Sequence, residues 1–377
     1  MYHLVVIRRL YIHNFRCLEN FELPISGKSS ALLIGKNGSG KSAVGFALEI
    51  LQRIARGTHR VGDLLKPKDL VRGRTDVPVR FEIEVEIHAK IYRYVVAFEL
   101  SDVNKELRVL EEWLVEDGTT LYKRQLAELR LARAGQLDES FALNRDLVAL
   151  PIVQGRSAND PIFIFKQWLA NMLILRPVPS LILGDSEHAT FQPNVQVTNF
   201  AAWFTGLLIS TPGAYTKLFE YLRQVMPDLK DIKNQVVGQE SRKLEVQFSN
   251  QQGSVTIPFS DLSDGEKCFM ICAMVLASNT PYGHVFCFWD EPDNYLAMSE
   301  VGHFVLALRS AFQSGGQFIA TSHNSEAISQ FSDENTFLLY RNSHLEPTII
   351  RPISEIRASG NLNGDLVGAL IRGDVEP

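Results

Sequence analysis

The stretch Ala31-Leu-Leu-Ile-Gly-Lys-Asn-Gly-Ser-Gly-Lys-Ser42 decides the fold. Its first four residues are apolar and predict a buried strand, and the apolar-rich run 43–51 that follows predicts a helix. Between them, residues 35–42 match the pattern G-x-x-x-x-G-K-[ST], in which a glycine-rich loop joins a strand to a helix. Because the motif and both flanks agree, we favour a phosphate-binding loop over a glycine-rich turn that matches by chance.

The residue types of this loop explain how it would hold a nucleoside triphosphate. Glycines let the backbone turn inward, so that several N–H groups point at one anion beside a helix N-terminus. We expect Lys41 to reach the β- and γ-phosphates and the Ser42 hydroxyl to hold Mg²⁺. The expected ligands are therefore ATP and Mg²⁺. The expected contacts of the loop with the nucleotide are Gly35, Lys36, Asn37, Gly38, Ser39, Gly40, Lys41, Ser42 and Ala43.

Composition bounds the class of protein. Of the 377 residues, 45% are hydrophobic and 21% are charged, which is typical of a soluble globular protein with one large domain or two smaller ones. The formal net charge of −5 argues against a surface that is basic throughout. A local basic groove stays open as an alternative.

Cysteine use and hydropathy predict a cytoplasmic protein. The four cysteines have no C-x-x-C spacing, and Cys268 and Cys272 lie four residues apart in an apolar segment, which favours core packing. A reducing, cytoplasmic location follows. No signal peptide is evident, and the apolar stretch 161–179 is interrupted by Lys166 and Arg176. We interpret that stretch as a buried or groove-lining helix and expect no membrane span.

The pattern of the first third of the chain predicts mainly strands. Residues 3–12 and 20–24 predict two short strands before the phosphate loop. Residues 81–87 alternate strictly between apolar side chains and glutamates, which predicts a half-buried strand. Further strand patterns at 91–100 and within 107–123 indicate an antiparallel meander rather than a βαβ arrangement.

The middle of the chain reads differently. Residues 124–235 are mainly helical in pattern, with breaks at prolines, and no heptad run predicts a long coiled coil. The expected fold class is therefore α/β, with three parts. These are an N-terminal lobe at 1–123, an inserted helical subdomain at 124–235 and a C-terminal lobe at 236–377.

A basic run follows the helix of the phosphate loop. Its residues are Arg53, Arg56, Arg60, Lys66, Lys68, Arg72 and Arg74, against Asp63 and Asp69. We favour a solvated helix-and-loop surface. A face for DNA, RNA or an acidic partner is the alternative.

Three downstream elements suit the second half of a nucleotide site. Ser263 and Glu266 have capping-box spacing ahead of an apolar helix, which by itself predicts only a well-started helix. The exposed N–H groups of such a helix start, together with Ser263 and Gly265, would also bind a γ-phosphate.

The second element is the apolar strand 285–289, which ends in Asp290 and Glu291. Adjacent carboxylates at a strand end are costly unless they meet a cation or solvent. We expect Asp290 to hold Mg²⁺ and Glu291 to orient and deprotonate the attacking water, in preference to two ordinary loop acids.

The third element is the strand 317–321, which leads to His323. A lone histidine is usually structural. After these neighbouring motifs, we favour a catalytic role in which His323 senses the γ-phosphate.

Taken in order, these motifs resemble those of ABC-type ATPases. GKNGSGKS is similar to Walker A, LSDGE to the ABC signature, FCFWDEPDNYL to Walker B with its D-loop, and IATSHN to the switch-histidine segment. The opening His-Asn-Phe-Arg-Cys-Leu is similar to that of the RecF, SMC and OLD branch, and the strand patterns at 336–340 and 347–352 also suit it. Within that branch, the chain resembles stand-alone AAA-type ATPases of anti-phage and mobile-element loci, of the PtuA and AriA type.

The resemblance implies a P-loop ABC-ATPase head, with a mixed sheet plus an antiparallel meander. It implies a homodimer or higher homo-oligomer, in which ATP is sandwiched between the P-loop of one subunit and Ser263, Gly265 and Glu266 of another. It also places Asn14 and Arg16 near the nucleotide.

Some features depart from the family pattern. Asp264 replaces the second-position glycine of the usual transporter signature. We expect no nuclease domain after residue 377 and therefore no OLD-type cleavage. A Q-loop glutamine is not placed, and Arg80 stands near the expected region. Those departures leave the Q-loop metal contact unassigned.

Two functions compete on this basis, and two others are disfavoured. The first is an ATPase switch that controls a separate effector, a nuclease or toxin, in anti-phage defence, because the chain shows a hydrolysis set and no second catalytic constellation. The second is a RecF-like repair or recombination factor that binds DNA directly, supported by the basic run. A transporter subunit is disfavoured by the long separation of Lys41 from Ser263, and a P-loop kinase by the lack of a phosphoacceptor site.

Overall fold

The computed structural model describes residues 6–103, 105–133, 136–155, 157–237, 241–280, 283–360, 362 and 364–372. The chain forms two compact units. Unit 1 consists of Met1–Met172 and Phe331–Pro377, and unit 2 consists of Leu173–Gln330. Each unit has a hydrophobic core of its own strands and helices.

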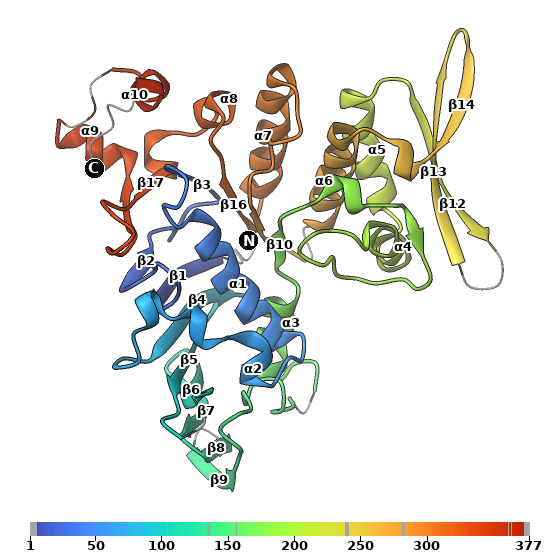
Figure 1. The fold of residues 1–377 in the computed structure, drawn as a ribbon. Helices are drawn as coiled ribbons and strands as arrows, with labels where there is room; N and C mark the ends of the chain where they lie inside the picture. Colours follow the sequence, from blue (N-terminus) through green and yellow to red (C-terminus); the bar gives the residue numbers. More distant parts are fainter. Residues whose placement is uncertain are drawn as a thin grey trace. The chain divides into compact units, whose positions relative to one another are not determined.

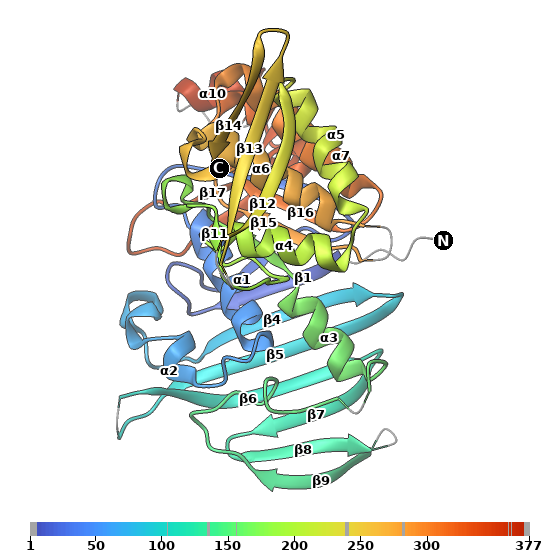
Figure 2. The same cartoon turned by 90° about the vertical axis from the view of Figure 1, so that its right-hand side faces the viewer.

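Unit 1 contains an antiparallel sheet of eight strands (Figures 1 and 2). The strands from β4 onward follow one another along the chain as a meander, as the alternating pattern predicts. In spatial order the strands are β2 (Phe21–Leu23), β1 (Val6–His13), β4 (Val79–Ile87), β5 (Lys90–Leu100), β6 (Leu107–Glu116), β7 (Thr119–Gln125), β8 (Glu128–Arg133) and β9 (Gln136–Ala142).

A second group of strands in unit 1 carries the phosphate loop. β3 (Ser30–Ile34) is buried along its whole length and pairs in parallel with β17 (Thr336–Tyr340). β17 in turn pairs antiparallel with β18 (Ile349–Pro352), so this group of strands is mixed. Helix α1 (Lys41–Ala55) follows β3, as predicted, and its buried residues recur at helical spacing.

Short helices complete unit 1. Phe165 of α3 packs against Tyr92 and Tyr94 on β5, with ring centroids 5.9 Å and 5.7 Å apart. The helices other than α1 are α2 (Val61–Leu64), α3 (Pro161–Ala170), α9 (Ile353–Ala358) and α10 (Leu366–Arg372). The 3₁₀ turns are η1 (Pro67–Asp69), η2 (Val71–Gly73) and η5 (Asp333–Asn335).

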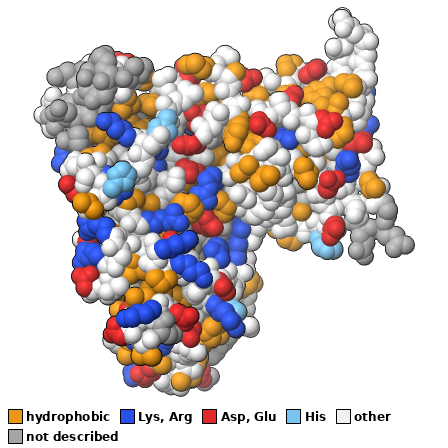
Figure 3. Space-filling model, viewed as in Figure 1, with side chains coloured by type: hydrophobic (Ala, Val, Ile, Leu, Met, Phe, Trp, Pro, Cys, Tyr) orange, Lys and Arg blue, Asp and Glu red, His pale blue; other side chains and the backbone are white. Residues whose placement is uncertain are grey.

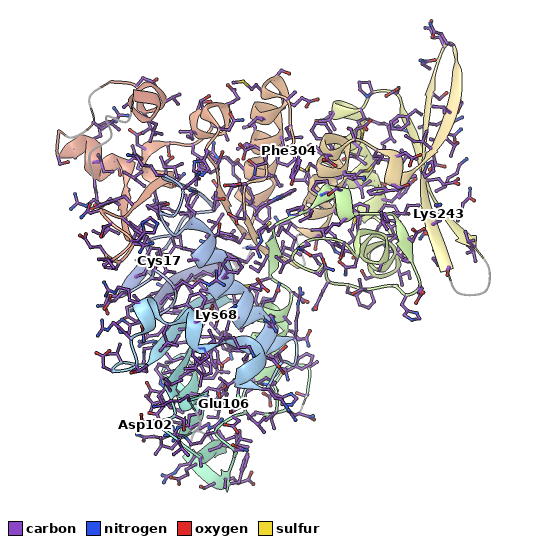
Figure 4. All side chains as sticks on the ribbon, in the orientation of Figure 1. Cys17, Lys68, Asp102, Glu106, Lys243 and Phe304 are labelled. Carbon is purple, nitrogen blue, oxygen red and sulfur yellow. The ribbon has the colours of Figure 1, made fainter. Side chains whose placement is uncertain are left out.

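Unit 2 is built around three parallel strands. β15 (Phe286–Trp289) lies between β10 (Leu173–Leu175) and β16 (Gln317–Thr321). Phe304, labelled in Figure 4, packs on Trp289 with ring centroids 5.5 Å apart. The helices are α4 (Phe200–Ser210), α5 (Ala214–Val225), α6 (Asp264–Ser278), α7 (Met298–Gln313) and α8 (Ser325–Ser329), with 3₁₀ turns η3 (Pro179–Leu181) and η4 (Phe259–Asp261).

A second sheet in unit 2 has β13 at its centre. β13 (Ser241–Asn250) pairs antiparallel with β12 (Leu229–Val237), β14 (Gly253–Pro258) and the short β11 (Asp185–Ser186). In Figure 4, Lys243 marks β13. The longest helix among the described residues is α7, with 16 residues, so the described chain has no long coiled coil, as predicted.

The structure differs from the sequence prediction between residues 124 and 175. β8 and β9 extend the meander to Ala142, in a region that we predicted to be mainly helical. The reason is visible in Glu128-Leu-Arg-Leu, which alternates with the period of a strand. The stretch predicted as one helix divides into α3 and β10, because Leu173 starts a parallel pairing with Cys287. The predicted strand at 3–12 is confirmed from Val6, and residues 3–5 lie outside the described chain.

A buried carboxylate ties the meander to the segment after it. Glu112 of β6 is fully buried and accepts hydrogen bonds from the hydroxyls of Tyr94 (3.0 Å) and Tyr122 (2.9 Å). It also accepts from the backbone N–H groups of Ala149 and Leu150 at 2.6 Å and 2.8 Å. Burial raises the pKa of Glu112. Four donors therefore compensate the desolvation of one carboxyl group.

A second carboxylate, Glu82 of β4, gathers three arginines on the polar face of the sheet. Arg9, Arg80 and Arg93 each donate to its oxygens, at 2.6 Å, 2.6 Å and 2.9 Å. Burial by itself would raise the pKa of Glu82, but the hydrogen bonds from the three arginines outweigh it and lower the pKa to about 2. Glu82 thus joins strands β1, β4 and β5 electrostatically.

We expect Glu82→Gln to reduce the free energy of unfolding at pH 7 by about 1–3 kcal/mol, because three guanidinium groups lose a charged acceptor. A depressed pKa means that the folded state binds fewer protons than the unfolded one. The stabilisation is therefore present above the unfolded pKa of about 4.3 and is lost as the pH falls toward 2. Urea unfolding at pH 7 and at low pH measures this, with Glu84→Gln on the same strand as the control. A deficit that is equal at both pH values would contradict the prediction.

Candidate functional site

The phosphate loop runs from the end of β3 to Gly40, the N-cap of α1. Gly35, Gly38 and Gly40 have φ angles of 146°, 77° and 105°, in the left-handed region that favours glycine. A Cβ atom at Gly35 would collide with the carbonyl oxygen of Leu339, and one at Gly40 would lie 2.5 Å from Oγ1 of Thr348. The backbone of the loop therefore favours glycine at these three positions, and at Gly35 and Gly40 there is no room for a side chain.

The side chains of the loop suit an anion. Lys41 is buried, and its Nζ donates to the carbonyl oxygens of Gly35 (2.7 Å) and Lys36 (3.3 Å). Its ammonium group thus lies along the loop, where a phosphate would be held. Ser42 is half-buried, and Ala43 is buried in the first turn of α1. Lys36, Asn37 and Gly38 are exposed, whereas the Ser39 hydroxyl is buried with no hydrogen-bond partner among the described residues.

The two residues expected beside the nucleotide, Arg16 and Asn14, have different surroundings. Arg16 lies against α1, with its guanidinium 3.8 Å from the centre of the Phe46 ring. This position agrees with a place near the loop, but its contact with a nucleotide stays a prediction. Asn14 is buried, and its side chain donates to the carbonyls of Arg74 and Val77 and accepts from the Val71 N–H. All three polar contacts are with the backbone of residues 71–77, so Asn14 has a structural role there. Its predicted place near the nucleotide stays a prediction.

Unit 2 brings the two predicted acids together with a threonine. Asp290 is buried at the end of β15, and its Oδ1 accepts a hydrogen bond of 2.6 Å from Oγ1 of Thr321. The same hydroxyl accepts from the N–H of Glu291 at 2.9 Å. Glu291 has a φ of 52°, a conformation that is uncommon outside glycine and often marks functional sites.

Glu291 and His323 also lie together. Nε2 of His323 is 3.6 Å from Oε1 of Glu291, and the Asn294 amide donates to Oε2 at 2.5 Å. Both side chains remain partly exposed, at 41% for His323 and 36% for Glu291. The carboxylate is thereby oriented on both oxygens and still open to water, as a general base requires.

Sequence reasoning missed one pair in this region. Asp293 is buried, and its Oδ2 accepts a hydrogen bond of 2.8 Å from the Ser322 hydroxyl, which in turn accepts from the Asn324 N–H. Burial raises the pKa of Asp293. The pair links the loop of Glu291 to the loop of His323. The only signal in the sequence was the position of each residue beside a predicted catalytic residue.

The signature segment forms a complete capping box. The Glu266 carboxylate accepts from the N–H of Ser263 (2.7 Å) and from its hydroxyl (2.8 Å), and the Glu266 N–H donates back to Ser263 Oγ at 3.2 Å. A Cβ at Gly265 would lie 3.1 Å from the carbonyl oxygen of Tyr295, so the D-loop packs closely on the start of α6. The local interpretation is thus confirmed. The role of Ser263, Gly265 and Glu266 toward a second subunit stays a prediction.

Comparisons with known proteins decide the family. The model of the RecF/RecN/SMC N-terminal domain matches residues 6–345. The chain belongs to this family. No curated protein matches it.

Solved structures show the same fold. An SMC head bound to the C-terminal winged-helix domain of ScpA is 13% identical, with a TM-score of 0.53 and coverage of 93% of this chain and 99% of that one. An SMC head with an extended coiled coil, bound to the C-terminal domain of ScpA from Pyrococcus furiosus, is also 13% identical, with a TM-score of 0.52 and coverage of 94% and 98%. The chain therefore has the α/β fold of an SMC-type ATPase head, as the motifs implied.

The donor set suits the ligands of this ATPase family. Mg²⁺ bound to a nucleotide keeps one or two protein ligands and several waters. The Ser42 hydroxyl and the Asp290 carboxylate are oxygen donors of that kind, and the glycine cradle accommodates phosphate oxygens. Among the described residues, no group of three or more histidine, cysteine, aspartate or glutamate side chains could hold a metal by itself.

The basic run is largely engaged within unit 1. Arg53 donates to the Asp63 carbonyl, and Arg72 and Arg74 both bridge Glu19. Arg56 donates to the Ala170 carbonyl, and burial lowers its pKa to about 10. Figure 3 shows mainly basic side chains over this part of unit 1, with fewer acidic ones, and Figure 4 places Lys68 on it. The bonded arginines suit the solvated surface that we favoured, while the exposed Lys66 and Lys68 keep the alternative of a basic face.

Two other expectations can be compared with the structure. Arg80, which stands near the expected Q-loop, forms ion pairs with Glu82 and Glu111. A guanidinium group has no acceptor atom, so Arg80 does not replace a glutamine as a metal ligand. Cys268 and Cys272 are buried, as predicted for core packing, and Cys287 is buried as well; burial raises the pKa of each thiol. Within the described chain, no helix is both long enough and apolar enough to cross a bilayer.

We expect Gly40→Ala to reduce stability by about 2–5 kcal/mol, because left-handed strain adds to overpacking against Thr348. The matched control is Gly57→Ala, just beyond the other end of α1. Gly57 has a φ of 109° and no atom within 4 Å of an added Cβ. That control should lose only the strain, about 1–2 kcal/mol. Chemical denaturation of both variants tests this, and equal losses would show that packing around Gly40 is loose.

Proposed function

We propose that the chain is an ABC-type ATPase switch that binds ATP and Mg²⁺, closes as a dimer around the nucleotide, and hydrolyses it. The observation that carries the proposal is the arrangement at the end of β15. There Asp290 is buried and oriented by Thr321, while Glu291 is held by Asn294 beside His323. A pair of carboxylates in two such different environments suits two roles, one at a metal and one at water.

The roles follow from the environments. Glu291 would accept a proton from the attacking water, because its carboxylate is partly exposed and fixed in direction. His323 would hydrogen-bond to the γ-phosphate. Lys41 would stabilise charge on the β- and γ-phosphates from its place along the loop. Mg²⁺, when bound through Ser42 and Asp290, would neutralise phosphate charge.

A second copy would complete the site. In the arrangement that the family resemblance implies, Ser263, Gly265 and Glu266 of one subunit approach the ATP on the P-loop of another. The N–H groups at the start of α6 and the Ser263 side chain are suited to an anion. The Glu266 carboxylate, which caps its own helix, would keep that start in order rather than touch phosphate.

The output would pass to a separate protein. The similar SMC heads were solved bound to ScpA, which is a separate partner. We propose by analogy that this head controls an effector, a nuclease or toxin in anti-phage defence, in the cytoplasm where its four unpaired cysteines stay reduced. Direct DNA binding of the RecF type is the other outcome. Duplex binding that falls with salt and requires ATP would favour it.

We expect Glu291→Gln to bind ATP normally and to hydrolyse it about 10²–10⁴-fold more slowly, because the general base is lost. The variant should accumulate as an ATP-bound dimer, visible by light scattering, while phosphate release reports turnover. Lys41→Ala is the comparison, since it should lose nucleotide binding itself. Hydrolysis at the parental rate in Glu291→Gln would remove Glu291 from the mechanism.

The dimer has its own test. Lys41→Ala disables the P-loop and Ser263→Arg disables the signature, so neither protein should hydrolyse ATP alone. If the site is shared between copies, a mixture of the two regains hydrolysis, because one of the two sites in each mixed dimer is intact. Mixing Lys41→Ala with Glu291→Gln is the control, because both changes would disable the nucleotide site on the P-loop side and leave both signatures intact. A mixture of Lys41→Ala and Ser263→Arg that stays inactive would argue for a site within one chain.

A further inference from the structure

The connection between β17 and β18, residues 341–348, contacts the phosphate loop. Oγ1 of Thr348 donates a hydrogen bond of 2.8 Å to the carbonyl oxygen of Ser39. Nη1 of Arg341 donates to the carbonyl oxygen of Gly38 at 3.3 Å. Two consecutive carbonyls of the loop are thus held from a segment some 300 residues later in the chain.

The connection is a built structure of its own. Arg341 also donates to the carbonyls of Glu346 (2.9 Å) and His344 (2.7 Å), so one guanidinium closes the connection and reaches the phosphate loop. Arg72 donates to the Leu345 carbonyl from outside. Thr348 is buried, and its N–H donates to the Cys17 carbonyl at 2.9 Å. These bonds fix both ends of the connection against unit 1.

Peptide geometry explains what the two bonds achieve. In a trans peptide, the C=O and the following N–H point in opposite directions. Holding the Ser39 carbonyl toward Thr348 therefore directs the Gly40 N–H to the opposite side. Holding the Gly38 carbonyl toward Arg341 likewise orients the Ser39 N–H, which closes the turn by donating to Lys36 at 3.2 Å. A loop binds phosphate through backbone N–H groups that point into its concave side, and this requires the preceding carbonyl groups to point away from that side.

Thr348 and Cys17 pack so closely on Gly40 that the backbone of the phosphate loop has no room to shift toward them. A Cβ atom at Gly40 would be 2.5 Å from Oγ1 of Thr348 and 3.0 Å from Sγ of Cys17. The hairpin itself does not need the Thr348 hydroxyl, because its ladder already closes with the pair Tyr340 and Ile349. The hydroxyl is one residue beyond that pair and faces the phosphate loop. Its bond to Ser39 is therefore a contact to the loop rather than part of the hairpin.

We propose that Thr348 and Arg341 are positioning residues for the nucleotide, and that the β17–β18 connection is a clamp on the phosphate loop. This inference rests on the proposed function, because it takes the loop to bind ATP. The clamp acts through the backbone of residues 38–40 and contributes no atom to the chemistry. It places control of ATP affinity partly in the C-terminal hairpin of unit 1.

The decisive comparison is Thr348→Val with Thr348→Ser. Valine keeps the shape and removes the donor, so we expect ATP to bind about tenfold more weakly, because the Ser39 carbonyl loses its partner. KM should rise while kcat at saturating ATP is unchanged, since the lost interaction acts on bound substrate and transition state alike. Serine keeps the hydroxyl and should restore parental affinity. A fluorescent ATP analogue measures binding, and thermal unfolding checks the fold.

The matched control is Thr336→Val. Thr336 is a buried threonine on β17 whose hydroxyl donates to the Ser332 carbonyl at 2.9 Å, beside β3 but away from the loop. It should lose stability without losing ATP affinity. If Thr348→Val does not fold, Arg341→Gln decides, because Arg341 is only half-buried; weaker ATP binding supports the clamp and parental binding overturns it.

The outcomes separate the two proposals. If the parent binds ATP and Thr348→Val binds it equally well, the clamp is wrong and the proposed function stands. If the parent itself binds no ATP, both proposals are overturned, because the clamp takes the loop to bind ATP. A loss of affinity in Thr336→Val as large as that in Thr348→Val would also overturn the clamp, because hairpin stability would then explain both.

Discussion

The left-handed backbone of the phosphate loop is the constraint on which the rest of unit 1 depends. Three glycines take φ angles that other residues adopt only under strain, and two of them lie so close to other chain segments that a methyl group would not fit. The neighbours that approach them, Leu339 and Thr348, belong to the C-terminal hairpin. The loop is thus specified locally by glycine and completed by a distant segment.

In unit 2, one hydroxyl group orients both of the carboxylates predicted for the site. Asp290 ends a buried strand, where an ionised group without partners would be costly. A single hydroxyl, that of Thr321, donates to Asp290 and accepts from the N–H of Glu291. Because Thr321 is the last residue of the adjacent strand β16, parallel pairing of β15 with β16 is what brings the hydroxyl into reach. The strand register therefore sets the direction of both acids.

The sequence predicted the elements that are encoded within a few consecutive residues, but not the contacts between residues far apart in the chain. The phosphate loop, the capping box at Ser263 and the alternating strand β4 are each encoded within a few residues, and each is confirmed. We predicted roles for Glu291 and His323 at the attacking water and the γ-phosphate, and their meeting results from the parallel pairing of β15 with β16. The bonds of Thr348 to Ser39 and of Asp293 to Ser322 join residues 309 and 29 positions apart, and no local pattern reports them. The bonds of the Asn14 side chain are distant in sequence too, since its partners lie near residue 75.

Units 1 and 2 contain the same kind of contact. In each, a buried threonine at or next to the end of a strand orients the backbone of a loop: Thr348 donates to the Ser39 carbonyl, and Thr321 accepts from the Glu291 N–H. Threonine suits this place because branching at Cβ restricts its χ1 angle, so its hydroxyl is presented with little loss of side-chain freedom. A lysine or arginine could donate as well, but at the cost of a long flexible chain. The shape of the phosphate loop and of the acid pair thus depends on the strands that position these threonines, β18 for Thr348 and β16 for Thr321.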